Sequence, residues 1–370
     1  MPSSLWKSFL IHDSIPDSGF SIPDSEVLMK IGLLTGGGDC PGLNAVIRAV
    51  VKRAEQGDDE VLGIRNGWNG LLTGNVEPLT PFSVMGILPK GGTILGTSRT
   101  NPFKSTEGVQ KCLDFFRKFG LDALIAVGGE DTLGVAERLH ATQGLPVVGV
   151  PKTIDNDLAG TDSTFGFDTA VNIVMEAIDR LHSTAESHQR IMVVEVMGRD
   201  SGWIATVAGI AGGADYVIVP ERPYDIKEVC ATLAHRHESG RQFSIVVVAE
   251  GAAPKDGRHI LQQGGTDEFG HVRLGGVGQV VADEISKEMR IETRVTILGH
   301  VQRGGSPSAF DRVLGTRFGL RAVDLVRART FGRMVALSGT KIVDVPLPPP
   351  GRQKRFLDME LYSDAETFFG

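Results

Sequence analysis

Short apolar runs alternate along the chain with longer stretches in which apolar residues recur at helical spacing. The first pair is Ile31–Thr35 and Leu43–Glu55, joined by a glycine-rich turn, and it predicts a strand followed by a helix. Further strands are predicted at Ala123–Val127, Val147–Val150, Ile191–Val196, Tyr216–Val219, Ile245–Ala249 and Val295–Leu298. This alternation predicts an α/β fold with mostly parallel sheets flanked by helices. In such sheets ligands bind beyond the carboxyl ends of the strands, so we expect the functional site there.

Three segments depart from the alternation. Residues 1–28 are polar, contain the near-repeat Ser14–Ser18 and Ser21–Ser25, and are expected to form a flexible tail rather than a targeting signal. The polar, glycine-rich stretch Pro254–Gly276 is expected to be either a mobile loop or a small insertion. Residues 346–370 have proline punctuation and weak periodicity, so we expect a loosely packed C-terminal tail.

Composition narrows the class of protein. A chain of 370 residues is long enough for two α/β lobes with a cleft between them. No apolar stretch approaches the roughly 20 residues that span a bilayer, so membrane insertion is not expected. The net charge of −7 argues against general nucleic-acid binding, which needs a basic face. Three scattered cysteines fit neither a disulfide framework nor a metal knuckle, and they favour a reducing, cytoplasmic compartment.

Two glycine-rich motifs follow predicted strands. In Thr35–Asn44 the glycines let backbone N–H groups close on phosphate oxygens at a helix N-terminus, although such a turn is often only a tight strand-to-helix connection. It is not a P-loop, because the Gly-Lys-Ser/Thr ending is missing. In Val127–Thr132 two glycines precede Glu130 and Asp131, which could merely cap the helix. Two glycines and two carboxylates more economically describe a phosphate and Mg²⁺ site.

A third motif, Pro151–Asp157, places Asp155 and Asp157 two residues apart and therefore on one side of an extended segment. The alternative is an Asx-rich turn. Phosphoryl transfer to a hydroxyl needs one carboxylate to accept the proton and others to hold Mg²⁺, and this segment can supply both.

Five arginines lie beside predicted strand ends in this acidic chain. Any one of them is more often a solvated surface charge, but together they indicate sites for phosphorylated substrates, because the guanidinium group matches phosphate oxygens. They are Arg99, Arg190, Arg199, Arg294 and Arg303.

Taken in this order, the motifs closely resemble the phosphofructokinase family, from about Met29 to about Val343. The resemblance implies two doubly wound lobes with mostly parallel sheets and an active site in the cleft between them. It implies a phosphoryl-donor-binding lobe at 29–165, a fructose-6-phosphate-binding lobe at 166–299 and a return segment at 300–345 that completes the donor lobe.

The resemblance also implies roles for the residues that match the family's motifs. Asp155 would be the catalytic base that takes the proton from the sugar 1-hydroxyl, and Asp157 and Glu130 would hold Mg²⁺. Thr153 would assist near the transferred phosphoryl group, and Arg199 with Arg99 would neutralise the charge that develops on it. The donor would be bound by Gly37, Gly38, Asp131 and Lys152.

The acceptor, fructose 6-phosphate, would be held by a second set of residues that match the family: Arg190, Met197, Gly198, Glu250, Arg294, His300 and Arg303. In the family, the residues that match Arg190 and Arg294 reach in from a neighbouring subunit. We therefore expect a homodimer or homotetramer with shared active sites.

The choice of donor depends on two positions at which ATP-dependent bacterial members resemble one another in having glycines. Here they are Asp131 and Lys152. A carboxylate at 131 would occupy or repel the space of the ATP α-phosphate, and Lys152 could bind pyrophosphate or pair with Asp131. The combination resembles the pyrophosphate-dependent 6-phosphofructokinases.

Three alternatives remain open from the sequence. The nearest is an ATP-dependent phosphofructokinase. A lipid or NAD kinase would also place a glycine-rich turn after a strand, but would not require the Met-Gly-Arg and Gly-His-Val-Gln-Arg-Gly-Gly segments. A catalytically silent regulatory subunit should lack the base or a metal carboxylate, whereas Asp155, Asp157 and Glu130 are all present.

Overall fold

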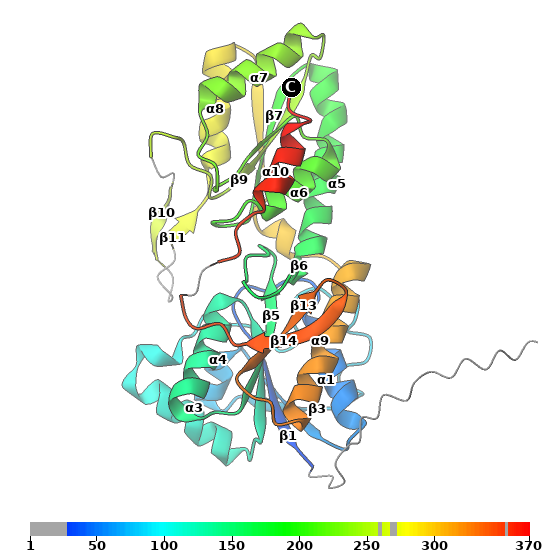
Figure 1. Ribbon diagram of the computed structural model, residues 1–370, viewed down its shortest axis with the longest axis vertical. Helices are drawn as coiled ribbons and strands as arrows, with labels where there is room; N and C mark the ends of the chain where they lie inside the picture. The colour runs from blue at the N-terminus through cyan, green and yellow to red at the C-terminus, as the bar shows by residue number, and fades with distance from the viewer. Residues whose placement is uncertain (1–27, 258–260, 267–271, 352–353) are drawn as a thin grey trace, which may run out of the picture.

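The computed structural model describes residues 28–257, 261–266, 272–351 and 354–370, and it has two lobes stacked along the long axis of the molecule (Figure 1). Residues 1–27, most of the predicted flexible tail, lie outside the described residues. None of the helices in the described part combines the length and apolar character needed to cross a membrane.

The first lobe, at the bottom of Figure 1, is built on an eight-stranded sheet. Its order is β14-β13-β5-β4-β1-β2-β3, with β6 paired to β5. The pairs from β13 to β2 are parallel, and only β14 and β3 run antiparallel at the two edges. This confirms the predicted mostly parallel sheet. The strands are β1 (Lys30–Thr35), β2 (Glu60–Ile64), β3 (Val76–Leu79), β4 (Ala123–Gly128), β5 (Val147–Thr153), β6 (Phe165–Gly166), β13 (Arg333–Ser338) and β14 (Lys341–Pro346).

Helices cover this sheet. They are α1 (Leu43–Glu55), α2 (Trp68–Thr73), η1 (Pro102–Lys104), α3 (Thr106–Lys118), α4 (Glu130–Gln143) and α9 (Ala309–Arg327). The long helix α9 returns from the second lobe and packs on α1, and two glycines allow the close approach. An added Cβ at Gly319 would lie 2.7 Å from the Val46 carbonyl oxygen, and one at Gly315 would lie 3.0 Å from that of Gly42.

The second lobe contains a four-stranded, fully parallel sheet in the order β12-β7-β9-β8. Its strands are β7 (Ile191–Val196), β8 (Tyr216–Ile218), β9 (Ser244–Ala249) and β12 (Thr293–Ile297). Its helices are α5 (Phe167–His188), α6 (Trp203–Gly212), α7 (Ile226–Glu238), α8 (Val277–Met289) and η2 (Gly299–Arg303). Within Pro254–Gly276 an antiparallel pair forms, β10 (Leu261–Thr266) with β11 (Val272–Leu274). Part of that stretch therefore has secondary structure of its own.

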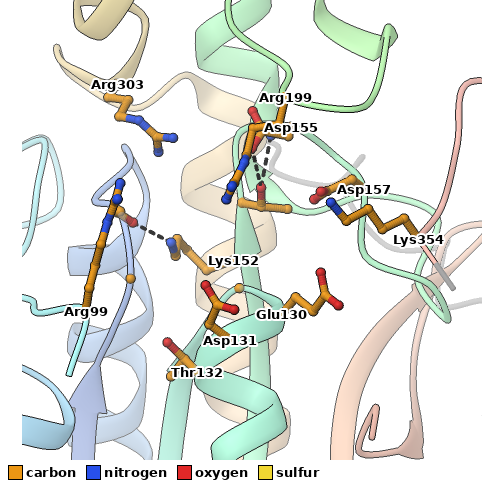
Figure 2. Close-up of a pocket in the computed structure, with 14 residues that line it drawn as sticks. Arg99, Glu130, Asp131, Thr132, Lys152, Asp155, Asp157, Arg199, Arg303 and Lys354 are labelled. Atoms are coloured by element: carbon orange, nitrogen blue, oxygen red, sulfur yellow. Dashed lines mark hydrogen bonds between the residues drawn. The ribbon is translucent and has the colours of Figure 1, made fainter. Parts of the chain in front are cut away.

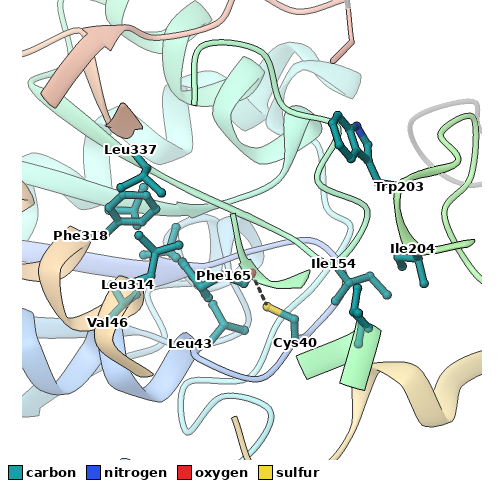
Figure 3. Packing of buried hydrophobic residues seen from close by; sticks show 14 of the residues in the cluster. Cys40, Leu43, Val46, Ile154, Phe165, Trp203, Ile204, Leu314, Phe318 and Leu337 are labelled. Carbon is teal, nitrogen blue, oxygen red and sulfur yellow. Dashed lines mark hydrogen bonds between the residues drawn. The ribbon is translucent and has the colours of Figure 1, made fainter. Parts of the chain in front are cut away.

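One hydrophobic cluster runs through both lobes (Figure 3). Phe165 of β6 and Phe318 of α9 meet edge-on, with ring centroids 6.4 Å apart, and both are fully buried. Ile154 continues the cluster toward Trp203 and Ile204 at the start of α6. Since side chains of the two lobes share this core, the segment after β5 is fixed from both sides.

The prediction of a loosely packed tail at 346–370 is wrong. Leu347 and Leu357 are buried, and the chain continues into α10 (Met359–Glu366). The Tyr362 hydroxyl donates to the Val217 carbonyl oxygen at 2.9 Å, and the Phe369 ring stacks on Tyr216 at a centroid distance of 4.6 Å. The C-terminal segment therefore leaves β14 in the first lobe and ends against β8 in the second (Figure 1).

Candidate active site

A cavity lies where the loops after β1, β4 and β5 meet the second lobe (Figure 2). It is strongly charged, and it brings together all of the residues that the sequence predicts for catalysis, donor binding and metal binding. Its lining is Gly37, Gly38, Arg99, Gly129, Glu130, Asp131, Thr132, Lys152, Thr153, Asp155, Asp157, Arg199, Arg303 and Lys354.

The glycine turn after β1 forms one wall of the cavity, through Gly37 and Gly38. Gly37 has a φ of 77°, which a residue with a side chain would rarely adopt. The Gly36 N–H donates to the Val127 carbonyl oxygen at 2.9 Å and the Gly37 N–H to that of Ser98 at 3.1 Å. In this arrangement the N–H groups of Gly36 and Gly37 therefore already donate to protein carbonyl oxygens, and donor binding by Gly37 and Gly38 stays a prediction.

Lys152 is the second-to-last residue of strand β5 and is 3% exposed. Its ammonium group donates to the Gly38 carbonyl oxygen, so it links β5 to the glycine turn (Figure 2). Burial lowers the pKa of Lys152, while the nearby carboxylates of Asp155 and Asp39 oppose that shift. The lysine is thus held at the cavity wall by the backbone of the predicted phosphate turn.

Asp155 is 4% exposed and is fixed by its neighbours on the chain. Its backbone N–H donates to the Thr153 hydroxyl at 3.0 Å, and that hydroxyl lies 3.5 Å from Asp155 Oδ2. The Thr164 hydroxyl donates to the Thr153 carbonyl oxygen at 2.8 Å, which holds the turn. Within the described part of the chain Asp155 Oδ1 has no hydrogen-bond partner. A buried carboxylate oxygen of this kind is available to accept a proton from a hydroxyl.

Asp157 and Glu130 line the same end of the cavity (Figure 2). Burial, reinforced by the charge of Asp155, raises the pKa of Asp157 to about 7. In the described residues no three His, Cys, Asp or Glu side chains are grouped closely enough to hold a metal ion by themselves. Two carboxylates nevertheless suit Mg²⁺, which is commonly held by one or two carboxylates, phosphate oxygens of the substrate and water.

Arginines close the side of the cavity that faces the second lobe. Arg199 adopts a φ of 54°, and its N–H donates to Glu250 Oε1 at 3.2 Å. Arg303 Nη1 donates to the Asp39 carbonyl oxygen at 3.3 Å. Burial, together with the charge of Asp155, raises the pKa of Glu250 to about 7.

The predicted acceptor residues are not all in the cavity. Arg303 lines it, and Glu250 contacts it through Arg199. Arg190 and Arg294 instead share one partner, Glu292, with a distance of 2.7 Å from Arg190 Nε to the carboxylate. Three other residues, Met197, Gly198 and His300, are likewise absent from the lining. The lining of this cavity therefore contains only one of the residues predicted to hold fructose 6-phosphate, Arg303.

The sequence analysis missed Lys354, which also lines the cavity. It lies in the proline-punctuated C-terminal segment, remote from every motif, so no local pattern marks it. Thr132 was named only as the end of a motif, yet its side chain fills the space beside Gly36 and Gly128. An added Cβ at Gly128 would lie 2.3 Å from Thr132 Cβ, which explains the glycine at that position.

The two α/β lobes, with carboxylates and basic groups meeting at the strand ends between them, define a phosphoryl-transfer class of enzyme. The family model for phosphofructokinase matches residues 30–326, and the chain belongs to the phosphofructokinase family.

Individual relatives agree on the family and differ in donor. A pyrophosphate–fructose 6-phosphate 1-phosphotransferase of Streptomyces coelicolor is 56% identical, and the match covers 92% of this chain and 100% of that protein. ATP-dependent 6-phosphofructokinase 3 of the same organism is 53% identical over 91% of this chain and 99% of that protein. The solved phosphofructokinase of Saccharomyces cerevisiae is 32% identical with a TM-score of 0.75, covering 92% of this chain but only 45% of the yeast chain.

Proposed function

We propose that this chain is a 6-phosphofructokinase that transfers a phosphoryl group reversibly from pyrophosphate to the 1-hydroxyl of fructose 6-phosphate. The observation that carries the proposal is the presence of Asp131 and Lys152 in the lining of the same cavity as Asp155. A carboxylate at 131 places a negative charge where a longer nucleotide donor must pass, whereas pyrophosphate needs no space there. The relatives named pyrophosphate–fructose 6-phosphate 1-phosphotransferase, at 51–57% identity, support the same donor.

The residues that line the cavity have different roles in the proposed reaction. Asp155 accepts the proton of the sugar 1-hydroxyl through Oδ1, and Thr153 holds that carboxylate in place. Arg199 and Arg99 face the transferred phosphoryl group and offset its charge. Phosphotransferases of this family typically use a metal ion, and we propose Mg²⁺ held by Glu130 and Asp157, where it would neutralise donor oxygens.

The remaining assignments follow from the same proposal. Gly37 and Gly38 line the donor site. Fructose 6-phosphate binds to Arg303 and Glu250 of one subunit. Arg190 and Arg294 of a neighbouring subunit complete this binding site, in a homodimer or homotetramer. We place the enzyme in the cytoplasm, since its three cysteines are all buried free thiols.

ATP as the donor is the second candidate, and one structural observation favours it. A second cavity shares Glu130 and Asp131 with the first and continues past Phe103 and Arg138 to Pro350. It could receive a nucleoside beyond the phosphate site. Two of its lining residues contact each other, with the guanidinium of Arg138 over the Phe103 ring, 4.0 Å from its centroid.

One assay separates the two donors. Fructose 1,6-bisphosphate formation is measured from fructose 6-phosphate and Mg²⁺ with either pyrophosphate or ATP. We expect turnover with pyrophosphate and little or none with ATP, and measurable reverse reaction with orthophosphate. Much faster turnover with ATP would contradict the proposal and establish the second candidate.

The matched variants are Asp131→Asn and Asp131→Gly. Asparagine removes the charge and keeps the size, whereas glycine removes both. We expect ATP use to rise from the unmutated enzyme to Asp131→Asn and further in Asp131→Gly, because the block is both electrostatic and steric. Equal ATP use in all three proteins would show that Asp131 does not select the donor.

A further inference from the structure

The C-terminal segment leaves the first lobe after β14 and ends in α10 on the second lobe (Figure 1), and its residue Lys354 lines the cavity. On the first lobe, Leu347 is buried, and an added Cβ on Gly134 of α4 would lie 3.3 Å from the Pro350 backbone. On the second lobe, the Leu357 N–H donates to Glu221 Oε1 at 2.9 Å. Lys354 lies between these anchor points.

Backbone contacts tie the segment to the turn that carries the catalytic carboxylates. The Arg355 N–H donates to the Asp157 carbonyl oxygen at 2.9 Å, and Arg355 Nη1 donates to that of Asn156 at 3.3 Å. The Arg355 guanidinium also lies over the Trp203 ring, 4.2 Å from its centroid. The position of residue 354 is therefore set relative to Asp157 rather than by a free chain end.

From this position the side chain of Lys354 extends to the cavity and lines it. Figure 2 shows it beside Asp157 and above Glu130, across the cavity from Arg99. It is 22% exposed and forms an ion pair with the more exposed Asp200, at the rim. Burial acts against its charge, but the pairing with Asp200 and the charges of Asp157 and Glu130 outweigh it, so the pKa of Lys354 is raised.

This lysine supplies positive charge where the cavity is most acidic. Lys152, on the opposite wall, is engaged by the Gly38 carbonyl oxygen, and Arg303 by that of Asp39. Pyrophosphate carries several negative charges on a few atoms, so tight binding needs cations around it on more than one side. Lys354 is suited to that task because an ammonium group on a long side chain can turn from Asp200 to a phosphate oxygen.

We propose that Lys354 is a donor-binding residue, whose ammonium group binds an oxygen of the phosphoryl donor at the Glu130 and Asp157 end of the cavity. The residue lies beyond the part of the chain that matches the family model, which ends at 326. The inference rests on the proposed function for the identity of the reaction, but it applies to the phosphates of either donor.

The test uses the full-length enzyme with Lys354→Met, Lys354→Arg and Asp200→Asn. Steady-state rates are measured against pyrophosphate, fructose 6-phosphate and Mg²⁺ in turn, with the other two saturating. Loss of one charge-assisted contact should raise the KM for pyrophosphate by about 10–100-fold in Lys354→Met. Lys354→Arg should recover most of that loss, and the KM for fructose 6-phosphate should change little.

Asp200→Asn is the matched control, because it breaks the same ion pair and keeps the lysine. If Lys354 only anchors the segment through Asp200, the two variants should lose pyrophosphate affinity equally, which would overturn the proposal. An unchanged KM for pyrophosphate in Lys354→Met would also overturn it, as would a rise confined to the KM for Mg²⁺.

The assay of the unmutated enzyme with each donor tests the proposed function separately from the role of Lys354. If that enzyme uses ATP instead, the same comparison is made with the KM for ATP. If it turns over neither donor, calorimetric titration with Mg²⁺ and pyrophosphate compares the same variants. A weaker dissociation constant for Lys354→Met alone supports the inference, and equal constants contradict it.

Discussion

The side chain of Asp155 combines burial with an oxygen that has no hydrogen-bond partner in the described part of the chain. Leaving such a group unpaired costs stability, about 1–3 kcal/mol for a typical buried polar atom. The surrounding turn nevertheless holds it in place through Thr153 and Thr164. A structural role gives no reason to retain this arrangement, whereas proton acceptance from a bound hydroxyl requires it.

Replacing Asp155 with Ala should keep the fold and lower turnover by about 10²–10⁴-fold, the usual effect of removing a positioned general base. The KM for fructose 6-phosphate should change much less, because the carboxylate acts on the proton rather than on the phosphate. Initial rates and circular dichroism check both points. Near-normal turnover in a folded variant would remove Asp155 from the mechanism.

Glu250 predicts a pH dependence of stability. Its pKa rises from 4.5 to about 7 on folding, mainly because it is buried and also because Asp155 is near. Below pH 4.5 both states hold the proton, and between 4.5 and 7 only the folded state does. This group therefore makes the free energy of unfolding fall as pH rises through that window and stay low above it.

Glu250→Gln removes that titration. Without substrate, its free energy of unfolding should exceed that of the unmutated protein by on the order of 2 kcal/mol at pH 8, and by much less at pH 5. Urea unfolding at the two pH values measures the difference. The exposed Glu186→Gln variant is the control, and a difference for Glu250→Gln that is the same at both pH values would contradict the assignment.

At the scale of elements, the apolar runs predicted β1, β4, β5, β7, β8, β9 and β12, because a buried parallel strand leaves a continuous hydrophobic run. They did not predict β2, β3, β13 and β14 of the first lobe. β7 has the predicted bounds, Ile191–Val196. β5 extends past the predicted Val150 to Thr153, since Lys152 and Thr153 are polar residues in the strand and do not fit an apolar pattern. Both residues line the cavity, so the apolar pattern ended where polar side chains of the site take the place of hydrophobic ones.

The C-terminal segment could not be predicted from a local pattern. α10 is only eight residues long, and its buried side chains, Tyr362 and Ala365, find their partners in β8 and α6. The contact of Arg355 with Trp203 spans 152 positions of sequence. Contacts of this kind depend on the finished fold, and Lys354 was missed for that reason. Its neighbours Glu130 and Asp157, which follow strand ends directly, were found.

The α1 and α9 pair makes a testable claim about packing. Gly319→Leu should destabilise the protein by about 1–3 kcal/mol, because its Cβ would lie 2.7 Å from the backbone of Val46 and 2.8 Å from Ala49 Cβ. The better helix propensity of leucine returns only about 0.8 kcal/mol. Urea unfolding measures the net effect.

The control for this substitution lies on the outer side of the same helix. Leu320 is 37% exposed, so Leu320→Ala should shift the unfolding midpoint far less. An unchanged midpoint for Gly319→Leu would mean that the two helices can separate without cost.

At the scale of the whole molecule, the cavity contains all the residues predicted to bind the donor but few of those predicted to bind the acceptor. The cavity lined by the proposed donor-binding residues is assembled within one chain. The acceptor residues Arg190 and Arg294 instead pair with Glu292 outside it. The sequence motifs proposed these arginines for the acceptor site, but their shared pairing with Glu292 depends on the finished fold and could not be predicted.

Complementation between two inactive variants tests the shared site. Asp155→Ala lacks the base, and Arg294→Ala should bind fructose 6-phosphate more weakly by roughly 1.5–3 kcal/mol, so each is nearly inactive at low substrate. If Arg294 serves the partner's Asp155, a mixed dimer has one site with both defects and one intact site. Random exchange should then restore about a quarter of the sites in an equal mixture. Rates are measured at low fructose 6-phosphate before and after exchange, with demonstrated mixing of tagged subunits as the control. No recovery despite exchange would place Arg294 outside a shared site.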